Sequence, residues 1–387
     1  MKDVNRAGTF IKQATGYTAF VPRPLPPEPP LNIDFETVTL LSKADRCLGR
    51  LDGVTEILPN PDLFVAMYVK KEAVLSSQIE GTQASLIDVL DIPEASNLQK
   101  VRQVEEVVNY IKAMNYGLER LHDLPLSLRL FKEIHAILLQ GVRGSERSPG
   151  EFRRTQNWIG AAGCNLATAS FVPPPPYEMV QALGELEKYF YTEEEIPPLI
   201  KIGLIHAQFE SIHPFLDGNG RVGRLLITFW LCQQKILNKP LLYLSYFFKM
   251  NRTEYYDRLM DVRLRGAWEE WIKFFLRGVA EVSAEASETA KKILALKENH
   301  TVIINNGKLR NAANALKLLE KLFGQPIVTV RMVESYLDVS YPTANGLLSE
   351  LCELGILMTE ENKQRNRKYF YTEYVKLLQV GTELTGE

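Results

Sequence analysis

Residues 213–224, HPFLDGNGRVGR, bring several chemically useful side chains together in one short stretch. It contains a base, His213, a carboxylate, Asp217, closely spaced glycines and two arginines, Arg221 and Arg224. A structural loop needs glycine and little else, whereas phosphoryl or nucleotidyl transfer needs positioned cations, an anion-binding backbone and a base. The stretch therefore predicts a site for a nucleoside triphosphate.

A dinucleotide-binding loop is the first alternative, because residues 218–223 match the pattern GxGxxG. That pattern needs a preceding strand, but the apolar residues of segment 200–212 recur at helical spacing. It also needs an acidic residue about 20 positions later, and no Asp or Glu occurs in 224–253. The sequence instead indicates a helix, a tight loop and a second helix.

The start of this loop is expected to present the base. Pro214 disfavours helical geometry at His213, so the imidazole should lie at a helix end and face a cleft. Phe215 and Leu216 are expected to anchor the loop in the core. Asp217 beside phosphates suits Mg²⁺, which prefers one or two carboxylates together with phosphate oxygens and water.

The second half of the loop is expected to bind anions. Gly218 and Gly220 let backbone N–H groups approach phosphate oxygens, and the N-terminus of the next helix favours negative charge. Arg221 and Arg224 are three positions apart and therefore neighbours on one helix face. A lone His, an Asp before a glycine turn or two arginines would each have an ordinary surface explanation. Their occurrence in one loop favours the functional interpretation.

The stretch resembles the signature HPFx[D/E]GNGRxxR of the Fic family at every fixed position. Members of that family are mostly α-helical and typically transfer AMP from ATP to a hydroxyl group of a protein. The resemblance implies that His213 is the general base and that Asp217 holds Mg²⁺. It also implies a set of nucleotide-binding residues: Asp217, Gly218, Asn219, Gly220, Arg221, Val222, Gly223 and Arg224. Within this set, Gly218, Asn219 and Gly220 would bind phosphate oxygens, Arg221 the inner phosphates and Arg224 the γ-phosphate.

A second segment, far upstream, resembles the inhibitory motif [S/T]xxxE[G/N] of the same family. Ser76, Glu80 and Gly81 match its fixed positions. The resemblance implies that Glu80 pairs with Arg224 in place of the γ-phosphate. Without it, a glutamate at a helix C-terminus asks only for a cationic partner, which a surface salt bridge could supply.

Two further groups are assigned by resemblance to the nucleotide and target groove. Segment 150–176 is rich in Gly, Ala, Thr and Pro with β-favouring residues, which predicts a β-hairpin. It corresponds to the flap that positions a target hydroxyl, with Phe171 as a candidate groove residue, although an ordinary hairpin over the core would look the same. Tyr255 and Tyr256 resemble a tyrosine pair of the adenine pocket, and a buried aromatic pair explains them equally well.

The composition sets broad limits. The 387 residues are 45% hydrophobic and 24% charged with a net charge of -2, which gives no global attraction to nucleic acid or membranes. Neither an apolar leader nor an apolar run of membrane-spanning length is recognised, so we expect a cytoplasmic protein. The four cysteines lie far apart without metal-ligand spacing and are expected to be buried free thiols.

The elements that must position the site are mainly α-helical. The Pro-rich segment 21–30 cannot be helical and is expected to form an extended strap over the protein surface, with a polyproline ligand as the alternative. Helical periodicity predicts helices over 34–51, 60–79 with Asn60 as N-cap, 99–121, 128–139, 177–191, 199–212, 221–235 and 251–279. The predicted division is an N-terminal helical region over 1–120, a catalytic domain over 121–280, a helical connector over 281–306 and a small domain over 307–387.

The small C-terminal domain looks like a winged helix-turn-helix, with 341–354 as its recognition helix. That helix carries no Lys or Arg; the basic residues of the predicted wing are Lys363, Arg365, Arg367 and Lys368. Binding of DNA through the wing therefore stays open beside homodimerisation or protein docking. For the whole chain, the preferred hypothesis is an autoinhibited protein adenylyltransferase with ATP, Mg²⁺ and a hydroxyl-bearing target protein as partners. The alternatives are a Fic enzyme that transfers another phosphate-containing group and a DNA-binding regulator.

Overall fold

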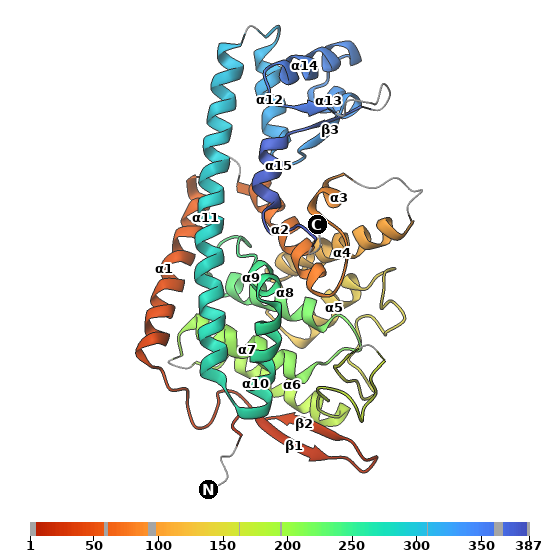
Figure 1. Ribbon diagram of the computed structural model, residues 1–387, viewed down its shortest axis with the longest axis vertical. Coiled ribbons are helices and arrows are strands. Elements are labelled where there is room, and N and C mark those ends of the chain that lie inside the picture. Colours follow the sequence, from red (N-terminus) through yellow and green to blue (C-terminus); the bar gives the residue numbers. More distant parts are fainter. Residues whose placement is uncertain are drawn as a thin grey trace.

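The protein is mainly α-helical, as predicted, in a computed structural model that describes residues 5–57, 61–91, 98–161, 163–193, 196–307, 309–359 and 367–384 (Figure 1). The helices of the body are α1 Phe35–Ile57, α2 Pro61–Ile79, α3 Leu86–Leu90, α4 Leu98–Arg120, α5 Leu128–Leu138, α6 Pro176–Phe190, α7 Pro198–Ile212, α8 Asn219–Gln233, α9 Ser245–Met250, α10 Arg252–Arg265 and α11 Trp268–Asn306. The C-terminal unit contains α12 Ala312–Leu322, α13 Val330–Leu337, α14 Tyr341–Glu353 and α15 Thr372–Gln379. The strands are β1 Gly8–Lys12, β2 Thr18–Pro22, β3 Ile327–Thr329, β4 Met358–Thr359 and β5 Lys368–Phe370.

Helix α7 forms the centre of the core, since every residue of 199–212 is buried. Helix α8 packs against α7, and the loop between them is residues 213–218. The long helix α11 runs along the molecule beside α1 and continues into the C-terminal unit (Figure 1). The helix–loop–helix that was predicted to carry the site therefore lies at the middle of the helical body.

Two helix predictions differ from the structure at α10 and α11. The predicted helix over 251–279 is interrupted at Gly266, whose φ of +65° is left-handed and ends α10. The predicted connector over 281–306 is not a separate element, because α11 is continuous across the boundary at 280. Its first half packs on α1 and α7, and its far end reaches α12 and α15. The N-cap predicted at Asn60 lies outside the described residues.

The N-terminal region contains a β-hairpin that was not predicted from the sequence. Strands β1 and β2 pair antiparallel from Gly8 with Pro22 to Lys12 with Thr18. The following segment 23–34 has no helix or strand, in agreement with the predicted strap. It is tied to the body by Gln208, which donates to the carbonyl of Arg23, and by Arg6, which donates to the carbonyl of Pro29.

The flap is less regular than the predicted hairpin over 150–176. Its described residues form a single antiparallel bridge, between Ile159 and Phe171, and the rest are turns and extended loops. The prolines at 173–176 supply no backbone N–H donors to a ladder, and Asn165 and Thr168 close a local turn with their side chains. Longer pairing is therefore not available to this segment.

The C-terminal unit contains helices α12, α13 and α14 and an antiparallel sheet in the order β3-β5-β4, and the helix predicted over 341–354 is α14. The wing residues Lys363 and Arg365 lie outside the described part of the chain. Lys368 lies on β5 and forms an ion pair with Asp91, at 2.6 Å, so this basic residue is engaged with the body of the protein.

Two expectations about the whole chain can be compared with the structure. Among the helices in the described ranges, none has both the length and the apolar character needed to cross a bilayer. All four cysteines are free thiols, but only Cys47 is buried, while the other three are partly exposed.

Candidate active site

His213 occupies a special backbone position at the end of α7. Its φ of 49° and ψ of 62° are left-handed, and its N–H still bonds to the carbonyl of Phe209 at 2.9 Å. The chain cannot continue as a helix, because Pro214 follows. The loop ends at Gly218, which is also left-handed, with a φ of 77°, and α8 begins at Asn219. Two left-handed residues thus fold the segment 213–218 back between two buried helices.

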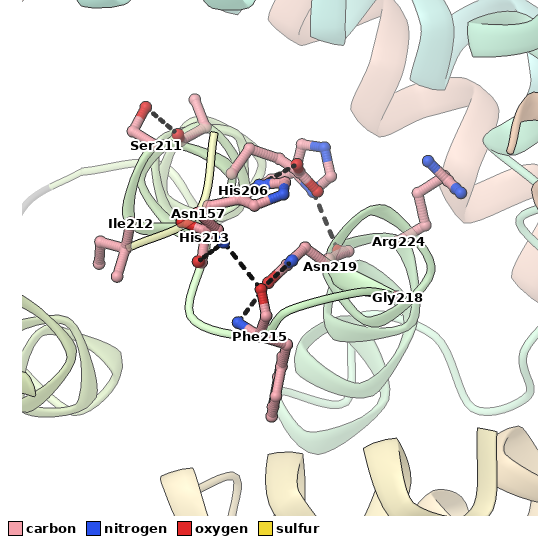
Figure 2. A network of polar contacts seen from close by, with 12 residues as sticks. Asn157, His206, Ser211, Ile212, His213, Phe215, Gly218, Asn219 and Arg224 are labelled. Carbon is pink, nitrogen blue, oxygen red and sulfur yellow. Dashed lines mark hydrogen bonds and ion pairs between the residues drawn. The ribbon is translucent and has the colours of Figure 1, made fainter. Parts of the chain in front are cut away.

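Asn219 holds this loop from inside. Its Oδ1 accepts the N–H of Phe215 and its Nδ2 donates to the carbonyl of the same residue, both at 2.8 Å (Figure 2). The Asn219 side chain is 3% exposed and is committed to the loop. Its backbone N–H, at the start of α8, is therefore the group that fits the phosphate contact implied by the family resemblance.

His135 on α5 supports the same loop from outside and was not identified from the sequence. Its Nδ1 accepts the N–H of Gly150 at 2.9 Å, so Nε2 carries the proton and donates to the carbonyl of Asp217 at 3.0 Å. The imidazole stacks on Phe215 with ring centroids 3.8 Å apart. Burial lowers the pKa of His135 to about 4, which keeps the ring neutral, and the two hydrogen bonds select this tautomer.

Two residues of the flap were also missed. Arg153 donates from Nε to the carbonyl of His213 at 3.0 Å, and Asn157 donates from Nδ2 to the same oxygen at 3.2 Å. Asn157 also donates to the carbonyl of Phe215 at 2.9 Å (Figure 2). The flap is therefore connected directly to the loop that carries the base.

The environment of His213 suits a neutral base. Burial and the cations Arg263 and Arg153 lower the pKa of its imidazole to about 3. Its Nδ1 makes no hydrogen bond to any described residue and lies 3.9 Å from Oε2 of Glu210. The side chain is nevertheless 19% exposed, so a substrate can reach the ring.

Arg221 is a buried cation whose nitrogens are not satisfied. It is 1% exposed, and among the residues that the structure describes none accepts a hydrogen bond from Nε, Nη1 or Nη2. The nearest carboxylate oxygen is Oδ1 of Asp217, at 3.6 Å from Nη2. A buried guanidinium normally has hydrogen-bond acceptors, so this geometry indicates a place for an anion at the N-terminus of α8.

Asp217 fits the metal role in part. Its Oδ1 accepts the N–H of Gly218 at 2.6 Å, and its side chain is 35% exposed. Within the described ranges no group of three or more His, Cys, Asp or Glu residues could hold a metal ion. A single accessible carboxylate suits Mg²⁺ that arrives with a polyphosphate, and not a metal bound by protein ligands alone.

Arg224 is held by the motif that was predicted to be inhibitory. Its Nη2 forms an ion pair with Oε1 of Glu80 at 2.7 Å, and its Nε donates to Oγ of Ser76 at 2.8 Å. Burial alone would raise the pKa of Glu80, but the Arg224 guanidinium outweighs this effect and the pKa is lowered. Glu80 Oε1 lies so close to Gly220 that a Cβ there would be 2.3 Å from it. The carboxylate therefore occupies space directly above the anion-binding turn.

Gly81 explains how α2 ends beside the site. Its φ of 92° is left-handed, so the chain cannot continue as a helix beyond α2, which ends at Ile79, and Glu80 and Gly81 form the turn that follows. Ser76 and Glu80 of the predicted trio contact Arg224 on α8, and Gly81 supplies the turn that follows them.

The aromatic candidates are placed differently from one another. Tyr256 is 39% exposed. Burial raises the pKa of its hydroxyl, and the nearby carboxylate of Glu80 is the second largest cause of that increase. Tyr255 is buried, and its hydroxyl bonds to Nε2 of His206 at 2.9 Å. His206 in turn bonds through Nδ1 to the carbonyl of Gly223. Tyr256 can form a wall of the site, whereas Tyr255 belongs to the packing that supports α8.

Phe171 is not brought to the open side of the site. It is 2% exposed, lies 5.7 Å from the ring of Phe20 and has the guanidinium of Arg263 4.1 Å above its ring. The prediction that it lines the nucleotide groove is therefore not supported by its position, since its ring packs between Phe20 and Arg263.

Comparison with known proteins agrees with this site. Family models for the Fic/DOC family N-terminal region and for the Fic/DOC family match residues 38–119 and 125–231. The Protein adenylyltransferase Fic of Drosophila grimshawi is 31% identical over 170 residues, covering 41% of this chain and 33% of that protein. A probable protein adenylyltransferase of Aquifex aeolicus is 41% identical over 176 residues, covering 45% of this chain and 51% of that protein.

The fold is also similar to that of a solved structure. A Fic family protein from Desulfovibrio desulfuricans superposes with a TM-score of 0.56 at 19% identity, over 88% of this chain and 97% of that one. The chain belongs to the Fic/DOC family, which confirms the resemblance found in residues 213–224. It spans only about a third to a half of the length of the two curated relatives described above.

Proposed function

We propose that the protein is an autoinhibited protein adenylyltransferase that transfers AMP from ATP to a hydroxyl side chain of a target protein. The observation that carries this proposal is Arg221, a buried guanidinium to which no described residue offers a hydrogen-bond acceptor, beside the turn that begins α8. A polyphosphate would supply those acceptors. The names of the curated relatives support adenylyl transfer over transfer of another group.

In the proposed reaction, Nε2 of His213 removes the proton from the target hydroxyl. The hydroxyl oxygen then attacks the α-phosphorus of ATP, the bond from that phosphorus to the bridging oxygen breaks, and pyrophosphate leaves. A base must be unprotonated to act, and the lowered pKa of His213 meets that requirement at neutral pH. Asp217 would hold Mg²⁺, which supplies charge stabilisation for the phosphates, while Arg221 and the N–H groups of 218–220 orient them.

The brake would act by competition for Arg224. This guanidinium faces Glu80 and Ser76, and the family resemblance gives the same guanidinium to the γ-phosphate. A charge-assisted hydrogen bond of this kind is worth about 1.5–3 kcal/mol. ATP must therefore displace Glu80 or bind without its γ-phosphate contact.

The alternative of a DNA-binding regulator is not favoured. Helix α14 presents no Lys or Arg, and Lys368 of the wing is paired with Asp91. Homodimerisation and docking of a protein on the C-terminal unit remain compatible with the proposal.

The test is incubation with Mg²⁺ and ATP labelled at the α-phosphate, using wild type, Glu80→Gly and the double variant Glu80→Gly/His213→Ala. We expect Glu80→Gly to raise protein-bound label about 10- to 100-fold, the equivalent of the lost ion pair. The double variant should lose about 10²- to 10⁴-fold of that activity, because it lacks the general base.

Controls separate the parts of the proposal. Label from ATP marked at the γ-phosphate would show phosphoryl transfer and contradict AMP transfer. Equal labelling by wild type and Glu80→Gly would refute inhibition by Glu80. Activity that persists in excess chelator would show that the reaction does not need Mg²⁺. If no variant produces protein-bound α-label, either on itself or on lysate proteins, the proposal of adenylyl transfer is wrong.

A further inference from the structure

The flap residue Arg153 has an unusual environment for an arginine. It is 3% exposed, and within the described chain its guanidinium donates to backbone carbonyls, those of His213, Ile212, Pro174 and Thr155. No carboxylate of the described residues forms an ion pair with it. Desolvation lowers its pKa to about 10, so the guanidinium still carries its charge at neutral pH.

The buried charge of Arg153 is stabilised by the helix end that it contacts. The carbonyls of Ile212 and His213 are at the C-terminus of α7, where the unpaired carbonyl oxygens concentrate negative potential. Arg263 binds the same turn one step earlier, donating from Nη2 to the carbonyl of Glu210 at 2.9 Å. Two buried cations thus fix the last turn of a helix that ends at the proposed base.

The backbone of His213 needs such support. A left-handed conformation is unfavourable for a residue with a Cβ, and here the residue carries the base. The carbonyl of His213 receives both Arg153 and Asn157, which holds the peptide plane between His213 and Pro214 in one orientation. The backbone N–H of Arg153 also donates to the carbonyl of Pro214 at 2.9 Å.

We propose that Arg153 and Asn157 are positioning residues that lock His213 in its left-handed conformation and aim its imidazole at the target hydroxyl. Both residues act through backbone carbonyls of the segment 212–215, and the carbonyl of His213 is the one that they share. Because Arg153 also binds the carbonyl of Pro174, at the other end of the flap, the same side chain fixes the flap relative to the base. This inference rests on the proposed function, since it assigns a role in the same reaction.

The experiment compares Arg153→Met with Arg154→Met, both in the Glu80→Gly background. Arg154 is the neighbouring residue and is exposed, which makes it a matched control. We expect Arg153→Met to lower kcat about 10- to 100-fold, the penalty of misplacing a reacting group by about 1 Å. The KM for ATP and the ATP affinity measured by calorimetry should stay within twofold, because Arg221, Arg224 and the turn at 218–220 are intact. Arg154→Met should match its Glu80→Gly parent.

Further variants keep the test decisive. Arg153→Lys preserves the charge and one donor and should recover part of kcat. If Arg153→Met does not fold, Asn157→Ala carries the test, since it removes a neutral amide that donates to the carbonyls of His213 and Phe215 in the same loop. A kcat within twofold of the Glu80→Gly parent would overturn the proposal. A parallel loss of kcat and ATP affinity would also overturn it, because it would indicate a general structural role.

A readout without activity distinguishes this proposal from the proposed function. The chain has five histidines, so the imidazole NMR signals of His213 can be identified by comparison with His213→Ala. Arg153→Met should move or broaden those signals, and Arg154→Met should leave them in place. If Glu80→Gly transfers no AMP, the proposed function fails, while unchanged His213 signals in Arg153→Met would refute the positioning role independently.

Discussion

Two parts of the site, the loop 213–218 and the end of α2, are held in opposite ways. The loop 213–218 is fixed by buried side chains from three other segments: His135 on α5, Arg153 and Asn157 in the flap, and Asn219 on α8. The end of α2 approaches the site with one carboxylate, Glu80, whose side chain is 30% exposed. Catalytic geometry requires the first kind of support and a removable inhibitor requires the second.

The difference is also visible in how the polar groups are satisfied. The loop directs its carbonyls to buried donors, and no described residue supplies an acceptor to Arg221, so an anion adds to it without breaking a bond. Arg224 has its partners already, in Glu80 and Ser76. An incoming γ-phosphate must replace a contact there, which makes Arg224 the point of control.

The largest test of this contrast is Asn219→Ala in the Glu80→Gly background. The loss of both bonds leaves the buried N–H of Phe215 without an acceptor, which costs about 1–3 kcal/mol, and leaves its carbonyl with Asn157 as the remaining side-chain donor. We expect a lower melting temperature and a loss of AMP transfer of about 100-fold or more, since base and phosphate turn shift together. Full activity with normal stability would show that the loop is not held by Asn219.

The sequence predicted the parts of the site that lie within one short motif. His213, Asp217, Arg221 and Arg224 come from a single loop and the start of one helix, so their spacing alone places them together. Helices α2, α4, α5, α6, α7 and α8 were predicted within about two residues at each end, because each buries one face at helical spacing or lies wholly in the core. The inhibitory trio was found through its resemblance to a family motif.

The sequence could not show the residues that hold the loop from a distance. Arg153 contacts a residue 60 positions away and His135 one 82 positions away, which no local pattern reports. Arginine is usually exposed, so nothing distinguishes the buried Arg153 from the exposed Arg154 beside it. The hairpin of β1 and β2 was missed because β1 is exposed at four of its five residues and has no alternating apolar face.

One helix boundary did carry a signal. Gly266 follows two basic residues, Arg263 and Arg265, in the last turn of α10, which is a typical helix C-terminus. The apolar spacing around Trp268 and Trp271 continued across it and favoured one long helix.

An intermediate effect is expected where the C-terminal segment contacts α2. Lys249 donates from Nζ to Oε1 of Gln78 at 2.7 Å and to the carbonyl of Gly381 at 3.1 Å. Gln78, which precedes Glu80 by two positions, also donates to the carbonyl of Thr382. Lys249→Met should loosen this end of the helix and raise basal AMP transfer about fivefold, the equivalent of roughly 1 kcal/mol of hydrogen bonding.

A double-mutant comparison decides whether Lys249 acts through the brake. In the Glu80→Gly background, Lys249→Met should produce no further increase, because the contact that it supports is already lost. A fivefold increase in both backgrounds would mean that Lys249 affects the site by another route, and the C-terminal segment would then have no part in holding Glu80.

The smallest effect is expected at Gly81, which ends α2 in a left-handed conformation and where an added Cβ would meet no heavy atom of the described chain within 4 Å. Gly81→Ala therefore causes no clash, and its cost is the backbone strain alone, about 1 kcal/mol. If the helix end shifts to relieve that strain, Glu80 moves with it, and basal AMP transfer should rise by up to about fivefold in the α-label assay. Gly81→Asn should stay close to wild type, because asparagine tolerates the left-handed region. Equal increases in AMP transfer for both substitutions would show that the Gly81 position responds to side-chain size and not to backbone strain. The explanation by backbone strain would then be wrong.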